Sequence, residues 1–155
     1  ESWNGTSWTE VNDLNTARYN IQGVGATNTA ALAVAGRNPP GSLAIVESWN
    51  GSSWTETTDV NTARFDAGGT TGDYTNALLI AGYTPSPGFL ANVEVWNGSS
   101  WTETTDLSSA KADLEGAGTG TAGIAFGGRT PPNSNSATTE IFSSPTTNTV
   151  TFTAS

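Results

Sequence analysis

The chain has 155 residues, of which 12% are charged and 18 are glycine, and its formal net charge at pH 7 is -9. It contains no Cys, which excludes disulfides, zinc–thiolate sites and a cysteine nucleophile, and no His, which removes the commonest general base and metal ligand. Five basic residues against fourteen acidic ones would repel a phosphate backbone, and no apolar run is long enough to span a bilayer, so we expect neither nucleic acid as a partner nor membrane insertion.

The first ten residues form a string that returns twice along the chain. It recurs at 47–56 and at 94–103, so equivalent tryptophans are spaced by 46 and then 47 residues. A period of this length indicates a repeat architecture. In each string an Asn-Gly pair lies between two strand patterns, which predicts a hairpin closed by a type I′ turn. The paired tryptophans are Trp3 and Trp8, Trp49 and Trp54, and Trp96 and Trp101.

After each string the chain gives the signals of two inner strands. A basic residue (Arg18, Arg64 or Lys111) opens a first strand rich in small residues, within 18–24, 64–70 and 111–117. The second strand is the most apolar, at 30–35, 77–81 and 123–127. Such a run, apolar on both faces, is typical of a strand covered on both sides. Each repeat therefore predicts four short strands, two inner and two outer.

The segments after the second strand differ most between repeats and carry most of the prolines. They lie at 37–41, 83–89 and 129–135. Loops held on a rigid scaffold are where binding most often resides, although solvated connectors would look the same. The candidate binding residues in these loops are Arg37, Tyr83, Phe89 and Arg129.

The last repeat departs from the pattern in its outer half. Residues 139–142 replace the third strand, 149–153 are expected to form the fourth, and the Trp pair and the Asn-Gly turn are missing, as in a terminal capping repeat. We divide the chain, as one segment, into an outer half-unit (1–12), two full units (17–58 and 63–105) and a degenerate terminal unit (111–155). Because the sequence starts at Glu1 within the pattern and lacks Met, we expect a mature product or a piece of a longer protein.

Several of these features together resemble the kelch repeat. They are a glycine after the second strand, an aromatic residue in the third, a Trp in the fourth and a basic residue before the next first strand, and the glycines are Gly36, Gly82 and Gly128. The resemblance implies an all-β fold of kelch-type β-propeller blades, each of four antiparallel strands. About three and a half blades are present, whereas closed propellers have 4–8. We therefore expect an arc that is part of a closed ring, completed by self-association or by the remainder of a larger propeller.

The repeated residues favour a structural role over a chemical one. The six Trp could stack on sugars, but their fixed place in each repeat favours packing against the adjacent unit. Glu47, Glu94 and Glu140 recur with Glu1, and a second acidic position (Asp13, Asp59 and Asp106) recurs with the basic residue of each repeat. Acid–base catalysis needs one unique pair of carboxylates with separated pKa values, so charges that recur in every repeat predict structural ion pairs. The copper radical oxidases among kelch-type propellers require Cys and His, which this chain lacks. We expect no enzyme activity, metal or cofactor.

Three functions remain. The first is a non-catalytic propeller scaffold or binding module, whose variable loops recognise a protein or a glycan. The near-identical repeats are similar to kelch-like arrays of bacterial and phage surface proteins, which implies an extracellular or virion-surface setting. The second is a lectin with one sugar pocket per blade. The third and least favoured is an enzyme with a central site, for which the inner strands offer few polar residues beyond Asn20, Asp66 and Asp113.

Overall fold

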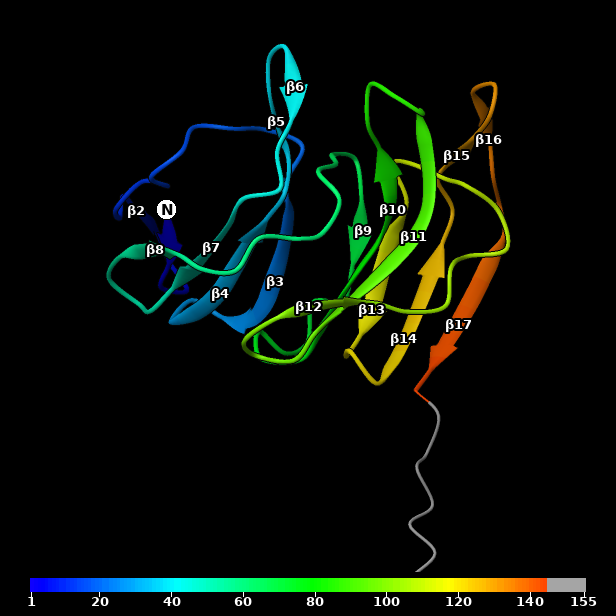
Figure 1. Ribbon diagram of the computed structural model, residues 1–155. Helices are drawn as coiled ribbons and strands as arrows, with labels where there is room; N and C mark the ends of the chain where they lie inside the picture. The colour runs from blue at the N-terminus through cyan, green and yellow to red at the C-terminus, as the bar shows by residue number, and fades with distance from the viewer. Residues whose placement is uncertain (145–155) are drawn as a thin grey trace, which may run out of the picture.

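The structure, a computed structural model, describes residues 1–144 and is all-β, with no helix in that range (Figure 1). Two four-stranded antiparallel sheets form its centre, and in each the strands pair in chain order. Unit 1 consists of β3 (Gln22–Thr27), β4 (Ala30–Val34), β7 (Val46–Trp49) and β8 (Trp54–Glu56). Unit 2 consists of β9 (Gly68–Gly69), β10 (Ala77–Tyr83), β11 (Phe89–Trp96) and β12 (Trp101–Glu103).

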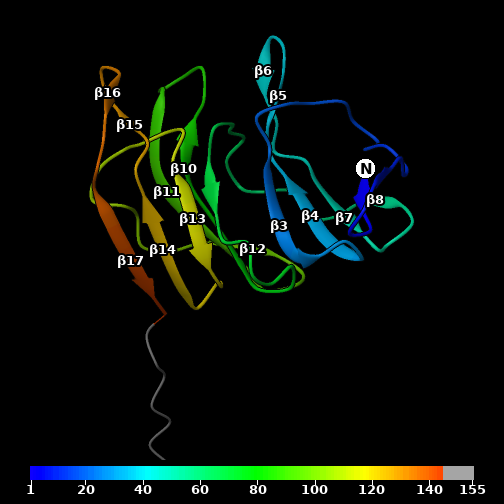
Figure 2. The same ribbon diagram turned by 180° about the vertical axis from the view of Figure 1, so that it is seen from behind.

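A third sheet and three two-stranded ribbons complete the described chain. Unit 3 has β13 (Glu115–Gly118), β14 (Ala122–Phe126) and β17 (Thr139–Ser143). The ribbons pair β1 (Ser2–Trp3) with β2 (Trp8–Thr9), β5 (Arg37–Asn38) with β6 (Gly41–Ser42), and β15 (Arg129–Thr130) with β16 (Ser134–Asn135). The units stand side by side in chain order, with the β1–β2 ribbon at one end and unit 3 at the other (Figures 1 and 2). Residues 1–144 form no closed ring, and the predicted strand at 149–153 lies outside the described residues.

The all-β expectation is confirmed, but the first strand of each unit begins later than predicted. We placed the starts at the basic residues, whereas β3, β9 and β13 start four residues further along the chain. The reason is a left-handed residue two positions after each basic residue, since Asn20, Asp66 and Asp113 have φ of 54°, 53° and 52°. A residue with this φ interrupts regular extended pairing at its position.

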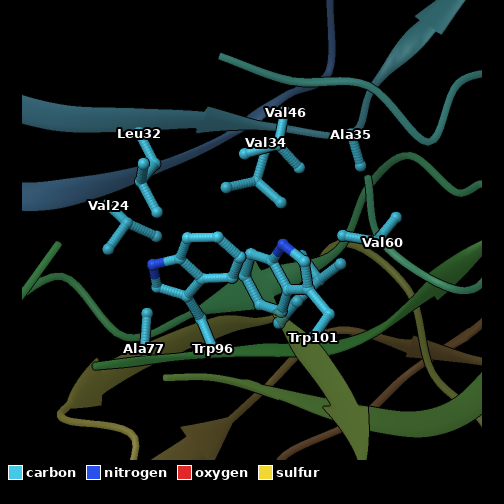
Figure 3. Packing of buried hydrophobic residues seen from close by; sticks show 10 residues of the cluster. Val24, Leu32, Val34, Ala35, Val46, Val60, Ala77, Trp96 and Trp101 are labelled. Carbon is cyan, nitrogen blue, oxygen red and sulfur yellow. The ribbon is translucent and has the colours of Figure 1, made fainter. Parts of the chain in front are cut away.

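The core lies between the units rather than within any one of them. Trp96 and Trp101 of unit 2 pack against Val24, Leu32 and Val34 of unit 1 (Figure 3). On the other face of unit 2, Leu78, Ile80 and Val93 form a second cluster with residues of unit 3. The central strand β10 is therefore buried on both faces over most of its length, as its apolar run predicts.

The six tryptophans occupy equivalent positions but differ widely in exposure. In each pair the two rings lie on neighbouring strands with centroids 5.2–5.4 Å apart. Trp96 and Trp101 are 3% and 5% exposed, because unit 1 covers them. Trp3 and Trp8 are 46% and 64% exposed, and no described sheet lies on their outer side. Burial of the Trp pair thus depends on the neighbouring unit.

The Asn-Gly turns are not the type I′ turns that we predicted. Trp49 pairs with Trp54, so the loop between the strands has four residues instead of two. Only Gly51 has positive φ, at 93°. The Asn50 side chain provides the hydrogen-bond acceptor of this loop. Its Oδ1 accepts hydrogen bonds from the backbone N–H groups of Ser52 and Ser53 at 3.0 and 2.9 Å. The loops at Asn4 and Asn97 have the same bonds.

We predict that Asn50→Ala lowers the free energy of unfolding by about 1 kcal/mol, because two backbone donors lose their acceptor in a loop that water can reach. Chemical denaturation followed by tryptophan fluorescence measures this change. Asn50→Asp keeps the acceptor and should cost less. Equal losses in the two variants would show that the side-chain oxygen does not hold the turn.

Candidate recognition face

The variable segments of the three units project from one face of the molecule (Figures 1 and 2). They are the β5–β6 ribbon, the loop between β10 and β11, and the β15–β16 ribbon. We predicted variable loops, and each segment is also paired at its base, where Arg37, Tyr83 and Arg129 bridge back to the residues that follow the repeated basic side chains. The bases of the segments are therefore fixed to the units, while their tips are exposed to solvent.

A glycine directs each segment out of its sheet. Gly82 has φ of 113°, and a Cβ at this position would lie 2.9 Å from the Phe65 carbonyl oxygen. Both the backbone conformation and the close approach therefore require glycine. Gly36 and Gly128 occupy the equivalent positions with φ of 109° and 90°.

An arginine–aromatic cluster lies at the base of this face and spans units 1 and 2. Its five members are Tyr19, Arg37, Phe65, Tyr83 and Phe89. The Arg37 guanidinium lies over the Phe65 ring at 4.5 Å and the Tyr19 ring at 5.4 Å. Phe65 contacts Tyr83 with ring centroids 5.4 Å apart, and Tyr83 meets Phe89 edge to face at 5.3 Å. Such cation–π and aromatic contacts fix the orientation of all five side chains.

Arg37 is the one basic side chain that forms no ion pair with any residue in 1–144. The other four basic residues each contact a carboxylate. The Arg37 Nε is buried and has no hydrogen-bond partner among the described residues. The cluster thus holds a positive charge that pairs with no carboxylate of residues 1–144, beside Tyr19, which is 47% exposed.

The structure brings together three of the four predicted binding residues. Arg37, Tyr83 and Phe89 belong to the cluster, whereas Arg129 contacts Asp113 and the side chain of Asn133. Sequence reasoning missed Tyr19 and Phe65. Both directly follow the basic residue of their repeat, and in unit 3 the same position holds Ala112. This difference between repeats was the available signal.

Each unit contains an ion pair at the repeated glutamate, buried in units 1 and 2 and partly exposed in unit 3. The repeated charges predicted structural ion pairs but did not show that the glutamate, rather than the repeated aspartate, is the partner of the basic residue. Arg18 meets Glu47 at 2.5 Å, Arg64 meets Glu94 at 2.5 Å, and Lys111 meets Glu140 at 2.8 Å. The backbone N–H of the linker also donates to the carboxylate, from Asn15 in unit 1 and from Asn61 in unit 2. These bonds tie the linker that enters a unit to the third strand of that unit.

Burial shifts the pKa values of the acidic and basic members of these pairs in opposite directions. Burial alone would raise the pKa of Glu47, but the Asn15 N–H and the Arg18 guanidinium outweigh it and hold this pKa below its ordinary value. The stabilisation from ionised Glu47 is therefore present above pH 4.5 and is lost as the pH falls through its lowered pKa. Burial lowers the pKa of Arg64, and the Glu94 carboxylate opposes that shift.

The three left-handed residues form a polar ladder across the units. Asn20 Nδ2 donates to Asp66 Oδ1 at 2.5 Å, and the backbone N–H of Asp113 donates to the Asp66 carbonyl at 2.8 Å. Burial raises the pKa of Asp66, and the neighbouring Asp113 carboxylate raises it further. These residues thus connect the units, and Arg129 contacts the last of them.

We predict that Asp66→Asn stabilises the protein at pH 7 but not at pH 3. Because the folded state raises the Asp66 pKa above its ordinary 3.8, the wild type loses stability as the pH rises through this range. Asn has no charge, can still accept the bond from Asn20, and tolerates the φ of 53°. Urea midpoints at the two pH values measure the difference. The exposed Asp59→Asn changes the net charge equally and should give no such pH-dependent gain.

No protein-family model matches the chain, and no curated protein matches it in sequence. Within residues 1–144, no group of three or more acidic side chains is placed to hold a metal ion. The same residues include no helix that could cross a membrane.

Proposed function

We propose that the chain is a non-catalytic segment of a kelch-type β-propeller whose variable face recognises a protein or a glycan. Each four-stranded sheet is then one blade, and unit 3 is a terminal blade. The setting is an extracellular or virion surface, where the segment belongs to a larger assembly.

The contact between successive sheets supports the propeller assignment. Trp96 and Trp101 of one sheet pack on the apolar side of the sheet before it, and the polar ladder joins the inner ends of all three units. The same kinds of surface recur without cover at both ends of the described residues. Trp3 and Trp8 are exposed at one end, and Phe126 and Ile141 are 42% and 77% exposed at the other. Such patches mark surfaces that are covered in an assembly.

The arginine–aromatic cluster is the observation that carries the recognition proposal. An exposed aromatic ring offers a stacking surface for a sugar or an aromatic side chain, and a guanidinium without an ion pair can bind a carboxylate or a hydroxyl group. Tyr19 and Arg37 provide both groups side by side. The contacts with Phe65 hold the guanidinium in place, so little conformational entropy is lost on binding.

Binding screens on the full chain test this function. A glycan array and a pull-down against the surface proteins of candidate hosts identify the ligand, and light scattering shows whether the mass is a multiple of 15.9 kDa. Arg37→Ala and Tyr19→Ala should each weaken binding at least tenfold, whereas Arg129→Gln, on the same face but outside the cluster, should not. Saturable binding of one sugar per unit, unaffected by Arg37→Ala, would instead favour the lectin.

A further inference from the structure

An open socket lies between the β1–β2 ribbon and unit 1. It is a cavity of about 820 Å³, and its walls include Glu1, Leu14, Ala31, Trp49 and Trp54. At the interface between units 1 and 2 the equivalents of the last four are Val60, Ala77, Trp96 and Trp101, and all of these are buried. Trp49 is also buried, at 6% exposed, whereas Leu14, Ala31 and Trp54 are only partly buried, so the wall is closed in one place and partly open in the other.

The closed interface shows what the socket lacks. Trp96 and Trp101 are covered by Val24 of β3 and by Leu32 and Val34 of β4, which are the two inner strands of unit 1 (Figure 3). The β1–β2 ribbon carries the repeated outer string, but residues 1–144 contain no inner strands to accompany it. Trp54 consequently remains half-buried, whereas its equivalent Trp101 is 5% exposed.

The missing ion pair of Glu1 is a second, independent sign that, within residues 1–144, the inner strands are absent at this socket. Glu1 occupies the position of Glu47, Glu94 and Glu140, each of which lies opposite a second-strand residue and contacts the basic residue ahead of the first strand. Glu1 is exposed, and none of the five basic side chains contacts it, since four pair with other carboxylates and Arg37 lies in the cluster. The socket has a mixed lining in which the partly exposed Trp54 and an acid that lacks its base lie together.

We propose that this socket receives a two-stranded hairpin of a further repeat of the same type. The second strand of the hairpin pairs with β1, its apolar side covers the partly exposed Trp54 and Ala31, and the basic residue ahead of its first strand binds Glu1. A second copy of the described residues is not the donor, because the inner strands of all three units are already hydrogen-bonded into their own sheets. The proposal rests on the repeat assignment made above.

An extended chain tests the proposal directly. Residues 15–46 carry Arg18, Val24, Leu32 and Val34 and run straight into the string that begins at Glu47. A copy of residues 15–46 placed ahead of Glu1 therefore supplies the hairpin in the native register. The segment contains no Trp, so the fluorescence of the extended chain still comes only from the six tryptophans of the parent chain.

Two changes are expected in the extended chain. The acrylamide accessibility of Trp54, assigned by comparison with Trp54→Phe, should fall several-fold relative to the parent chain. Glu1→Gln should lower the urea midpoint of the extended chain as much as Glu47→Gln does, yet leave that of the parent unchanged. Exchanging the two partners, by combining Glu1→Arg with Arg→Glu at the added copy of Arg18, should recover part of the stability that Glu1→Gln removes from the extended chain.

A peptide of residues 15–46 added to the full parent chain provides a second measurement. The proposal is supported if the unchanged peptide binds saturably and the Arg18→Gln peptide binds at least tenfold more weakly. When the protein carries Glu1→Gln, the two peptides should bind with equal affinity. Unchanged Trp54 accessibility together with a silent Glu1→Gln in the extended chain overturns it, as does closure of the socket by exchange of strands between two copies. None of these readouts involves the recognition face, so the failure of a ligand screen leaves them intact.

Discussion

Glu94→Gln is expected to lower the free energy of unfolding by about 3–5 kcal/mol, because it leaves the Arg64 guanidinium buried without a counter-charge. Both side chains are 0% exposed. The carboxylate also accepts hydrogen bonds from the backbone and side-chain nitrogens of Asn61, at 2.7 and 2.8 Å. The second carboxylate oxygen accepts from the Thr62 backbone N–H and the Arg64 guanidinium. An amide has only one oxygen, so the donors at one of these two positions also lose their acceptor. Urea denaturation followed by tryptophan fluorescence measures the loss.

Three further variants separate the buried charge from the overall charge. Glu56→Gln changes the net charge equally at an exposed position of β8 and should cost less than about 0.5 kcal/mol. Glu140→Gln should fall between the two, since Glu140 is 24% exposed and its partner is the flexible Lys111. The double variant Arg64→Met, Glu94→Leu should recover much of the loss, because an apolar pair leaves no buried charge. A loss from Glu94→Gln no larger than that from Glu56→Gln would contradict the argument.

The repeat and its strands were predictable because they depend on local chemistry. The apolar second strand and the position of the Asn-Gly hairpin are each visible in a few adjacent residues, and they predicted β10 and the loop at Asn50, although not its length. The late start of the first strand was missed because Asn20 and Asp66 take a left-handed conformation that Asn and Asp tolerate but do not require.

The arginine–aromatic cluster was only partly predictable, because it joins side chains from two units. Arg37 and Tyr83 stood out by their place in variable segments. Phe65 did not, since its contact with Arg37 depends on how unit 2 packs beside unit 1. No local pattern encodes that distance. Packing of the neighbouring unit also explains why nearly identical strings of residues can be buried in one unit and exposed in another.

Trp96→Ala and Trp3→Ala test this dependence, because the two residues occupy the same position in nearly identical strings. Trp96 is 3% exposed, packs against unit 1, and donates from Nε1 to the Tyr74 carbonyl at 3.1 Å. Its removal opens a cavity between two sheets and should cost about 3–5 kcal/mol. Trp3 is 46% exposed and contacts mainly Trp8, so its removal should cost about 1 kcal/mol or less.

The comparison is informative because local sequence is held constant while the neighbouring unit changes. Chemical denaturation gives the two losses, and the slope of each transition reports whether the sheets still unfold together. If stability came mainly from within each sheet, the two substitutions would cost similar amounts, and the packing between units would be incidental. A large loss for Trp96 alone would show instead that each unit is stabilised by the one before it. Stability would then rise as further units cover the exposed ends, as expected when nearest-neighbour interfaces stabilise a repeat protein.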